Sequence, residues 1–223
     1  MNTKERIACE ALTLFSSKGY SAVSVRDIAR AAGIKESSIY NHYKGKQAIF
    51  DELVETYDAR ADAFFGQFAS PEHLEGNVIE NMAYMKTLDG LVDMVLVSVE
   101  QYLCDDYFFK FFRMLSIERF NNEKVQAIYQ KMFIDGALDY QAQLFAWMID
   151  NGYFVRADPQ MAAMQFHGPI YMIFNQFEPG VTDMKAVMQT LERHVRQFAA
   201  LYDVREKNHE AESLAYPLYE PGH

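Results

Sequence analysis

The stretch AAGIKESSIYNHYKGK, residues 31–46, decides the fold that the sequence predicts. Gly33 interrupts a helical pattern, and a second short helix, at about residues 36–43, needs little more than Ile39 to face inward. Two short helices joined by a tight turn that contains glycine are typical of a helix-turn-helix. The hydroxyl, amide and imidazole groups of the second helix are therefore left to meet another surface.

The sequence on either side supplies supporting helices. A first helix ends at Gly19, and Ser24 offers an N-cap oxygen to a second helix, VRDIARAA. A long fourth helix, at about 46–65, follows the turn, and at ~1.5 Å per residue it can span from one domain to another. The inward positions of the first two helices recur at helical spacing: Ile7, Ala11, Leu14, Phe15, Val25, Ile28, Ala29 and Ala32.

Basic residues concentrate at the N-terminal end of an acidic chain. The net charge is −10, yet residues 1–46 hold eight Lys or Arg against four acids, which gives +4. The remaining 13 bases and 27 acids give −14. The N-terminal end is thus suited to approach a polyanion, and the rest would be repelled by one. A solvated basic face is the alternative.

The polar groups of residues 37–46 match what the major groove of DNA offers. Hydroxyl and amide groups, as in Ser37, Ser38 and Asn41, can bond base edges, whereas Tyr, His and Lys side chains can bond phosphates. Lys46 falls in the first turn of the long helix, where free backbone amides also favour a phosphate. Simple solvation of a short polar helix stays open as the other explanation.

The stretch GYSAVSVRDIARAAGIKESSIYNHYKGKQAIF, residues 19–50, resembles the DNA-binding segment of the TetR family of bacterial transcriptional regulators. The resemblance lies in the Gly-aromatic pair at 19–20, the Asp-Ile-Ala run at 27–29, the His-aromatic pair at 42–43 and Lys46, and it covers roughly the first quarter of the chain. The departures are mild, with Ser24 where Thr is common and Tyr43 where Phe is usual. Glu36 would repel phosphate, so we expect it to accept from a cytosine amine or to face away.

The resemblance implies a set of DNA contacts on this surface and a double-stranded DNA operator as the partner. Carried over position by position, the family's contacts fall on Arg26, Lys35, Ser37, Ser38, Tyr40, His42 and Lys46. The chemistry of the turn adds Asn41 and Tyr43.

Helical periodicity continues to the end of the chain and predicts an all-α fold. We expect an N-terminal three-helix helix-turn-helix DNA-binding domain followed by a larger helical ligand-binding and dimerisation bundle. The domains would cover 1–48, with the helix-turn-helix at about 24–43, and 49–205. A C-terminal tail at 206–223 is expected to be disordered, with docking on the bundle as the alternative. Further helices are expected at about 74–86, 89–103, 106–120, 123–150, 159–178 and 182–204.

Apolar seams on the last two helices predict a homodimer. Their apolar residues recur every three or four positions and would form a four-helix interface with a second protomer, as the family resemblance also implies. A second half-site ~34–36 Å away would then raise affinity for DNA. Periodicity does not distinguish this interface from an intrachain core. The expected interface residues are Phe166, Ile170, Phe174, Phe177, Met184, Met188, Leu191, Val195 and Phe198.

The larger domain is rich in side chains that can line an apolar pocket. The chain has 17 Phe, 14 Tyr and 12 Met, and such residues can hold a small apolar or aromatic effector that a polar group orients. Ordinary core packing is the alternative for each of them. We also expect His167-Gly168-Pro169 to interrupt its helix and open a gap beside the pocket, with a kink that fits the interface as the alternative. The expected lining is Phe108, Phe112, Arg113, Tyr129, Phe133, His167 and Tyr171.

Together these features predict a transcriptional regulator, specifically a repressor that an unidentified small-molecule effector releases from its operator. The alternative is a DNA-bound adaptor whose C-terminal domain binds another protein. No enzyme is expected, because no Gly-rich phosphate loop, G-x-S-x-G or H-E-x-x-H motif occurs. No cofactor or metal is expected, since Cys9 and Cys104 lack the spacing of a zinc site. Without a signal peptide or a long apolar run, the protein is predicted to be cytoplasmic.

Overall fold

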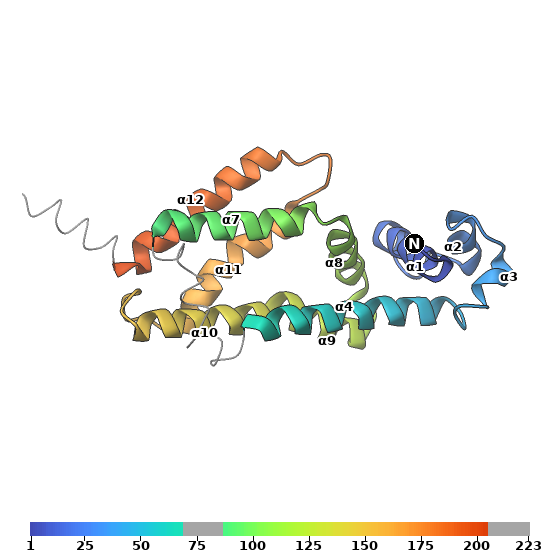
Figure 1. Ribbon diagram of the computed structural model, residues 1–223, viewed down its shortest axis with the longest axis horizontal. Coiled ribbons are helices and arrows are strands. Elements are labelled where there is room, and N and C mark those ends of the chain that lie inside the picture. The colour runs from blue at the N-terminus through green and yellow to red at the C-terminus, as the bar shows by residue number, and fades with distance from the viewer. Residues whose placement is uncertain (69–86, 205–223) are drawn as a thin grey trace, which may run out of the picture. The chain divides into compact units, whose positions relative to one another are not determined.

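The computed structural model describes residues 1–68 and 87–204. Within these ranges the regular structure is helical, apart from one isolated antiparallel bridge between Phe154 and Asp203. Figure 1 shows helices throughout this part of the chain. The prediction of an all-α fold is therefore confirmed. The helix expected at 74–86 and the tail at 206–223 lie outside the described residues.

The chain divides into two compact units. One comprises Met1–Ser70 and Gln101–Gly136, and the other comprises Pro71–Glu100 and Ala137–His223. The first unit therefore contains the helix-turn-helix together with two later segments that the sequence analysis assigned to a separate domain. The functional boundary near residue 48 stays a prediction.

The first helices begin with well-formed caps. In α1 (Thr3–Lys18) and in α2 (Val25–Ala31) the N-cap residue and an acid three positions later form a capping box. Ser24 is the N-cap of α2, as predicted, and its partner is Asp27. Gly19 ends α1 with a φ of 79°, a conformation that glycine adopts without strain.

Helix α3 (Glu36–Ile39) is shorter than predicted. Beyond Ile39 the backbone continues as turns, with His42 N–H donating to the Ile39 carbonyl at 2.9 Å. Lys35 at the N-cap provides no side-chain hydrogen bond, and Asn and His are weak helix formers, so one turn is all that forms. Ile39 is the one fully buried residue in α3, which depends on its neighbours for stability.

An aromatic cluster fills the rest of the first unit. Helix α4 (Lys46–Phe68) stacks Tyr57 on Phe111 of α8 (Asp106–Glu118), with ring centroids 3.8 Å apart and planes 8° from parallel. Phe112 meets Phe133 edge to face at 5.0 Å, and Tyr129 lies 5.1 Å from the same ring. The edge-to-face contact of Phe112 with Phe133 is a geometry that aromatic pairs prefer.

The helix predicted at 123–150 is present, but it is α-helical at both ends and contains a π-helical turn between them. It consists of α9 (Glu123–Gln130), a π-helical turn at Lys131–Asp135 labelled η2, and α10 (Gly136–Asp150). A π-turn adds a residue to the helical repeat, which periodicity does not reveal. Its Phe133 reaches the aromatic cluster of the first unit.

The second unit is organised by packing of α11 (Pro159–Gln176) on α12 (Met184–Tyr202). Phe166 and Phe198 lie 4.9 Å apart, and Phe145 of α10 lies 5.3 Å from Phe198. Asp158 caps α11 ahead of Pro159, as predicted. The predicted interruption at residues 167–169 is wrong, because α11 runs through Pro169, whose missing N–H removes only one bond from a long ladder. Helix α7 (Leu88–Cys104) completes the described elements.

We expect Phe111→Ala to destabilise the protein by about 3–5 kcal/mol, because the substitution removes a fully buried ring from the aromatic cluster. Phe120→Ala is the matched control, since that ring is 79% exposed and its loss should change the free energy of unfolding by less than about 0.5 kcal/mol. Chemical denaturation measures both. Equal midpoints for the two variants would contradict the packing described.

Candidate nucleic-acid interface

Tyr20, in the loop between α1 and α2, connects three parts of the first unit. Its backbone N–H donates to Glu118 Oε1 at 2.7 Å, and its carbonyl accepts from Lys46 Nζ at 2.8 Å. Its hydroxyl donates to Gln47, and its ring packs on Phe50 with centroids 5.0 Å apart. The end of α8, the loop and the first turn of α4 are therefore held together around one residue.

Glu118 is the buried acceptor in this arrangement. Its residue exposure is 6%, and a Cβ added at Gly19 would lie 3.4 Å from its Oε1. The nearby carboxylate contributes, after burial and Asp51, to a raised pKa of the Tyr20 phenol. Sequence reasoning did not assign Glu118 this role. The available signal was its position seven residues after Phe111 and three after Leu115, on the apolar face of α8.

The structure leaves most of the predicted DNA contacts accessible. Arg26, Lys35, Ser37, Asn41 and His42 are exposed. Tyr40 follows α3 directly, and 56% of its surface is exposed although it is a large aromatic residue. Ser38 is half-buried beside them. These side chains come from α2, α3 and the turn after α3, and they supply cationic, hydroxyl, amide and imidazole groups.

Tyr43 lies elsewhere than predicted. Its residue exposure is 5%, and its hydroxyl donates to Glu52 on α4 at 3.0 Å. Burial, then this hydrogen bond, raises the pKa of the phenol far above its usual value. Lys4 of α1 pairs with the same carboxylate at 2.6 Å. Tyr43 thus belongs to the contacts that join α1 and α4, and we leave it out of the proposed DNA contacts.

Lys46 is half-buried at the start of α4. Besides its bond to the Tyr20 carbonyl, its Nζ lies 4.1 Å from the centroid of the Tyr20 ring, within the range of a cation–π contact. The charge still sits in the first turn of a long helix, where backbone amides add positive potential. Lys46 therefore combines a structural bond with a favourable position for a phosphate.

Ion pairs modify the charge of the same surface. Arg26 Nε lies 3.2 Å from Glu36 Oε2, and Arg30 lies 3.8 Å from Asp27. The capping hydrogen bonds from Ser24, followed by Arg30, lower the pKa of the Asp27 carboxyl. Lys35 forms no ion pair among the described residues, so its charge is available to a polyanion.

The residues predicted to bind an effector divide between the two units. Phe108, Phe112, Tyr129 and Phe133 lie in the first unit, where they are buried in the aromatic cluster. Arg113 of the same unit is exposed, so it does not line that cluster. His167 and Tyr171 belong to the second unit, where both are half-buried on α11.

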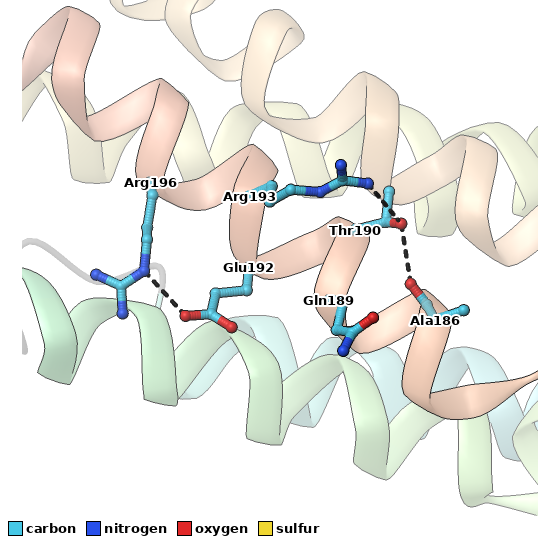
Figure 2. Close-up of a pocket in the computed structure, with 6 residues that line it drawn as sticks. All are labelled: Ala186, Gln189, Thr190, Glu192, Arg193 and Arg196. Atoms are coloured by element: carbon cyan, nitrogen blue, oxygen red, sulfur yellow. Dashed lines mark hydrogen bonds and ion pairs between the residues drawn. The ribbon is translucent and has the colours of Figure 1, made fainter.

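A surface hollow of about 510 Å³ lies along α12 (Figure 2). All its lining residues except Ala186 carry polar side chains. Arg196 bonds Glu192 of α12 at 2.9 Å and also Asp89 of α7 at 2.9 Å, and Arg193 points toward Thr190. A second hollow of about 620 Å³ lies at the turn between α8 and α9. None of the residues predicted to bind an effector lines either hollow.

The residues predicted to form a dimer interface are largely buried within one chain. Leu191 and Val195 are fully buried, and Phe166, Ile170, Phe177 and Phe198 are nearly so, because α11 packs directly on α12. Phe174, Met184 and Met188 are half-buried. The intrachain core that the sequence left open therefore accounts for much of this seam. The large exposed apolar residues of α11 are Met161, Met164 and Met172.

In residues 1–68 and 87–204, no helix has the length and apolar character that crossing a membrane requires. The same residues contain no group of three or more His, Cys, Asp or Glu side chains arranged to hold a metal ion.

The fold and this surface together define a helix-turn-helix protein with a helical C-terminal region. Residues 9–53 match the family described as bacterial regulatory proteins, TetR family. This segment, about a fifth of the chain, is therefore similar to the TetR family, and the predicted resemblance is confirmed. The biofilm operon negative transcriptional regulator IcaR of Staphylococcus aureus strain Newman is 41% identical over 51 residues, which is 23% of this chain and 27% of that protein.

Solved structures extend the likeness in fold to the rest of the chain. A putative TetR-family regulator from Mesorhizobium loti has a TM-score of 0.65 at 19% identity, covering 91% of this chain and 97% of that one. The complex of SmeT, a Stenotrophomonas maltophilia repressor, with triclosan has a TM-score of 0.64 at 18% identity, covering 100% and 99%. The IcaR proteins of Staphylococcus aureus and Staphylococcus epidermidis, which match in sequence, are both named as negative transcriptional regulators.

We expect Glu118→Ala to lower the free energy of unfolding by about 1–3 kcal/mol, because it leaves the Tyr20 N–H without its acceptor. Glu118→Gln keeps an acceptor oxygen at the same place and should lose less than about 1 kcal/mol. Urea denaturation of both variants separates the hydrogen bond from the packing of the side chain. If the Gln variant were as unstable as the Ala variant, the acceptor role of Glu118 would be refuted.

Proposed function

We propose that the protein is a DNA-binding transcriptional regulator, a homodimeric repressor that a small apolar or aromatic effector releases from its operator. The observation that carries this proposal is the exposed surface on α2, α3 and the following turn, which lies inside the segment that matches the TetR family. Repression is favoured because the names of IcaR and SmeT describe a negative regulator and a repressor. A regulator of this kind acts where the DNA lies, so we also propose the cytoplasm as its location.

The chemistry of the surface supports insertion into a major groove. Ser37, Tyr40 and Asn41 present hydroxyl and amide groups that can bond base edges, whereas Lys35 and His42 can bond phosphates. Because α3 buries only Ile39 fully, these side chains need not be withdrawn from the core to reach DNA. Lys46 and the first turn of α4 would contact the backbone beside the groove.

A second protomer would supply the second half-site, and α11 offers a surface for it. Met161, Met164 and Met172 are 47–54% exposed and, with Gly168, recur at spacings of three or four residues. They therefore share one face of the helix. Nothing lies within 4 Å of a Cβ added at Gly168, so another helix can approach closely there. We propose this methionine face, together with half-buried Phe174, Met184 and Met188, as the dimer contact.

The proposed effector site is the aromatic cluster of the first unit. Phe108, Phe112, Tyr129 and Phe133 would contact an apolar or aromatic molecule, and SmeT has been solved with triclosan. The cluster lies on α8, which packs on α1 and ends at Glu118 beside Tyr20. An effector that binds better when α8 is displaced would favour a state in which the loop before α2 has moved. The coupling therefore needs no contact between effector and DNA.

We expect Tyr40→Ala and Lys35→Ala to weaken DNA binding in different ways. Against a duplex that the wild-type protein selects from a random library, Tyr40→Ala should lose about tenfold or more in affinity, with little change on random duplex. Lys35→Ala should weaken both and reduce the slope of log K against log salt by about 0.9, because one phosphate contact is lost. Fluorescence anisotropy at several salt concentrations measures these effects.

Lys185→Ala on α12 removes the same charge outside the surface and should leave both affinities unchanged. If the wild-type protein bound the selected duplex no better than random duplex, the proposed function would have to be abandoned.

For the dimer, we expect the double variant Met164→Glu, Met172→Glu to raise the dissociation constant about a hundredfold, or about 2.8 kcal/mol, since two carboxylates would be buried at the contact. Analytical ultracentrifugation should then show monomers at concentrations where the wild type is dimeric. Val97→Glu, at a residue of α7 that is 53% exposed, is the control and should remain dimeric. Dimerisation of all three proteins with equal strength would exclude the methionine face.

A further inference from the structure

Arg26 and Glu36 form an ion pair between two different helices of the candidate interface. Arg26 lies in the first turn of α2, and Glu36 is the first residue of α3. The distance from Arg26 Nε to Glu36 Oε2 is 3.2 Å. Glu36 lies on the helix expected to enter a groove of DNA, where its carboxylate would be repelled by the phosphates. The question is therefore what interaction compensates for this charge.

The fold does not need this pair for its stability. The two side chains are 75% and 42% exposed, and exposed ion pairs contribute little to stability. The packing of α2 on α3 comes from buried Ile28, Ala29 and Ile39 instead, and the Ser24 capping box fixes the start of α2. The pair is therefore available for recognition.

The pair leaves directional groups available on both partners. Arginine has five N–H donors, and the contact at Nε engages one of them, so the two Nη groups keep the planar fork that matches guanine O6 and N7. Glu36 uses Oε2 in the pair, and its other oxygen can accept from a cytosine N4 amine. Guanine and cytosine present these complementary groups side by side in one base pair.

The negative charge of Glu36 also acts against unspecific binding. It partly neutralises Arg26, which reduces the attraction of Arg26 to any phosphate while its donor geometry is kept. The Glu36 carboxylate repels the DNA phosphates. At a base pair that offers a cytosine amine, the hydrogen bond to that amine offsets the repulsion, whereas at other base pairs nothing offsets it. Discrimination between sequences then rises although total affinity falls.

We propose that the Arg26–Glu36 pair is a specificity-determining unit that reads one G·C base pair in each half-site of the operator. The inference rests on the proposed function and deepens it, since it assigns a base pair to Arg26 and Glu36. Arg26 makes the contact to guanine, and Glu36 both positions Arg26 and contacts cytosine.

The experiment compares the wild type with Arg26→Lys, Glu36→Gln and their double variant in selection from a random duplex library, followed by anisotropy on single-base variants of the wild-type consensus. Arg26→Lys keeps the charge and loses the fork, and Glu36→Gln keeps the shape and loses the charge. Glu55→Gln, at an exposed residue of α4, is the charge-matched control. Thermal unfolding checks that every variant is folded.

Both single variants should lose the preference for G·C at the same symmetric position by about tenfold or more, and the double variant should lose little beyond either one. Glu36→Gln should also bind random duplex more tightly, whereas Glu55→Gln should leave every preference unchanged.

Unchanged base preferences in both variants, or altered preferences at two unrelated positions, would overturn the inference while leaving the proposed function standing. A uniform loss on all duplexes for Arg26→Lys would make Arg26 a phosphate contact and would overturn it as well. If the wild type selected no consensus at all, the proposed function itself would fail.

Discussion

The hydrogen bonds around the backbone of Tyr20 are the constraint on which the candidate DNA-binding surface depends. A loop residue with both its N–H and its carbonyl bound by distant side chains has little freedom to move, although loops are ordinarily the mobile part of a fold. Glu118 is ninety-eight positions away in the sequence, and Lys46 is twenty-six away. Because the acceptor is a buried carboxylate, the bond is stronger than one between neutral groups. The orientation of α2 is therefore tied to the end of α8.

This arrangement places the sensing and reading parts of the proposed regulator in one compact unit. The aromatic cluster includes Tyr57 of α4 and Phe111 of α8, and both helices reach Tyr20 through their ends. A change in how the rings pack can thus alter the support of the helix-turn-helix through direct contacts. Packed interiors tend to switch between discrete arrangements rather than deform continuously, which suits a two-state response.

Local signals explain what the sequence could predict. The caps at Ser24 and Asp158, the glycine that ends α1 and the helical periodicity each act over a few residues, so the all-α fold and the helix-turn-helix followed from them. The exposure of most of the predicted DNA contacts followed in the same way, because one short helix cannot bury many side chains. The extent of α3 was overestimated, since weak formers after Ile39 compete with turns on nearly equal terms.

The features that the sequence could not predict depend on contacts between residues far apart in the chain. Tyr43 seemed polar enough for DNA, yet Glu52 and Lys4 hold it inside the first unit. Glu118 became an acceptor only when α8 met the loop of Tyr20. The apolar seams of α11 and α12 have a helical period whether their partner is the same chain or another one. Burial of Leu191 and Val195 within the protomer could be learned only from the fold.

The shortness of α3 has an evolutionary consequence. Because Ile39 is the one residue of α3 that is fully buried, substitutions at its other positions should change the free energy of unfolding little. In the proposed regulator, single surface changes on α3 would therefore alter the preferred target sequence, while the buried network beneath preserves the architecture. With so short a helix, related proteins can diverge at these positions with little loss of stability.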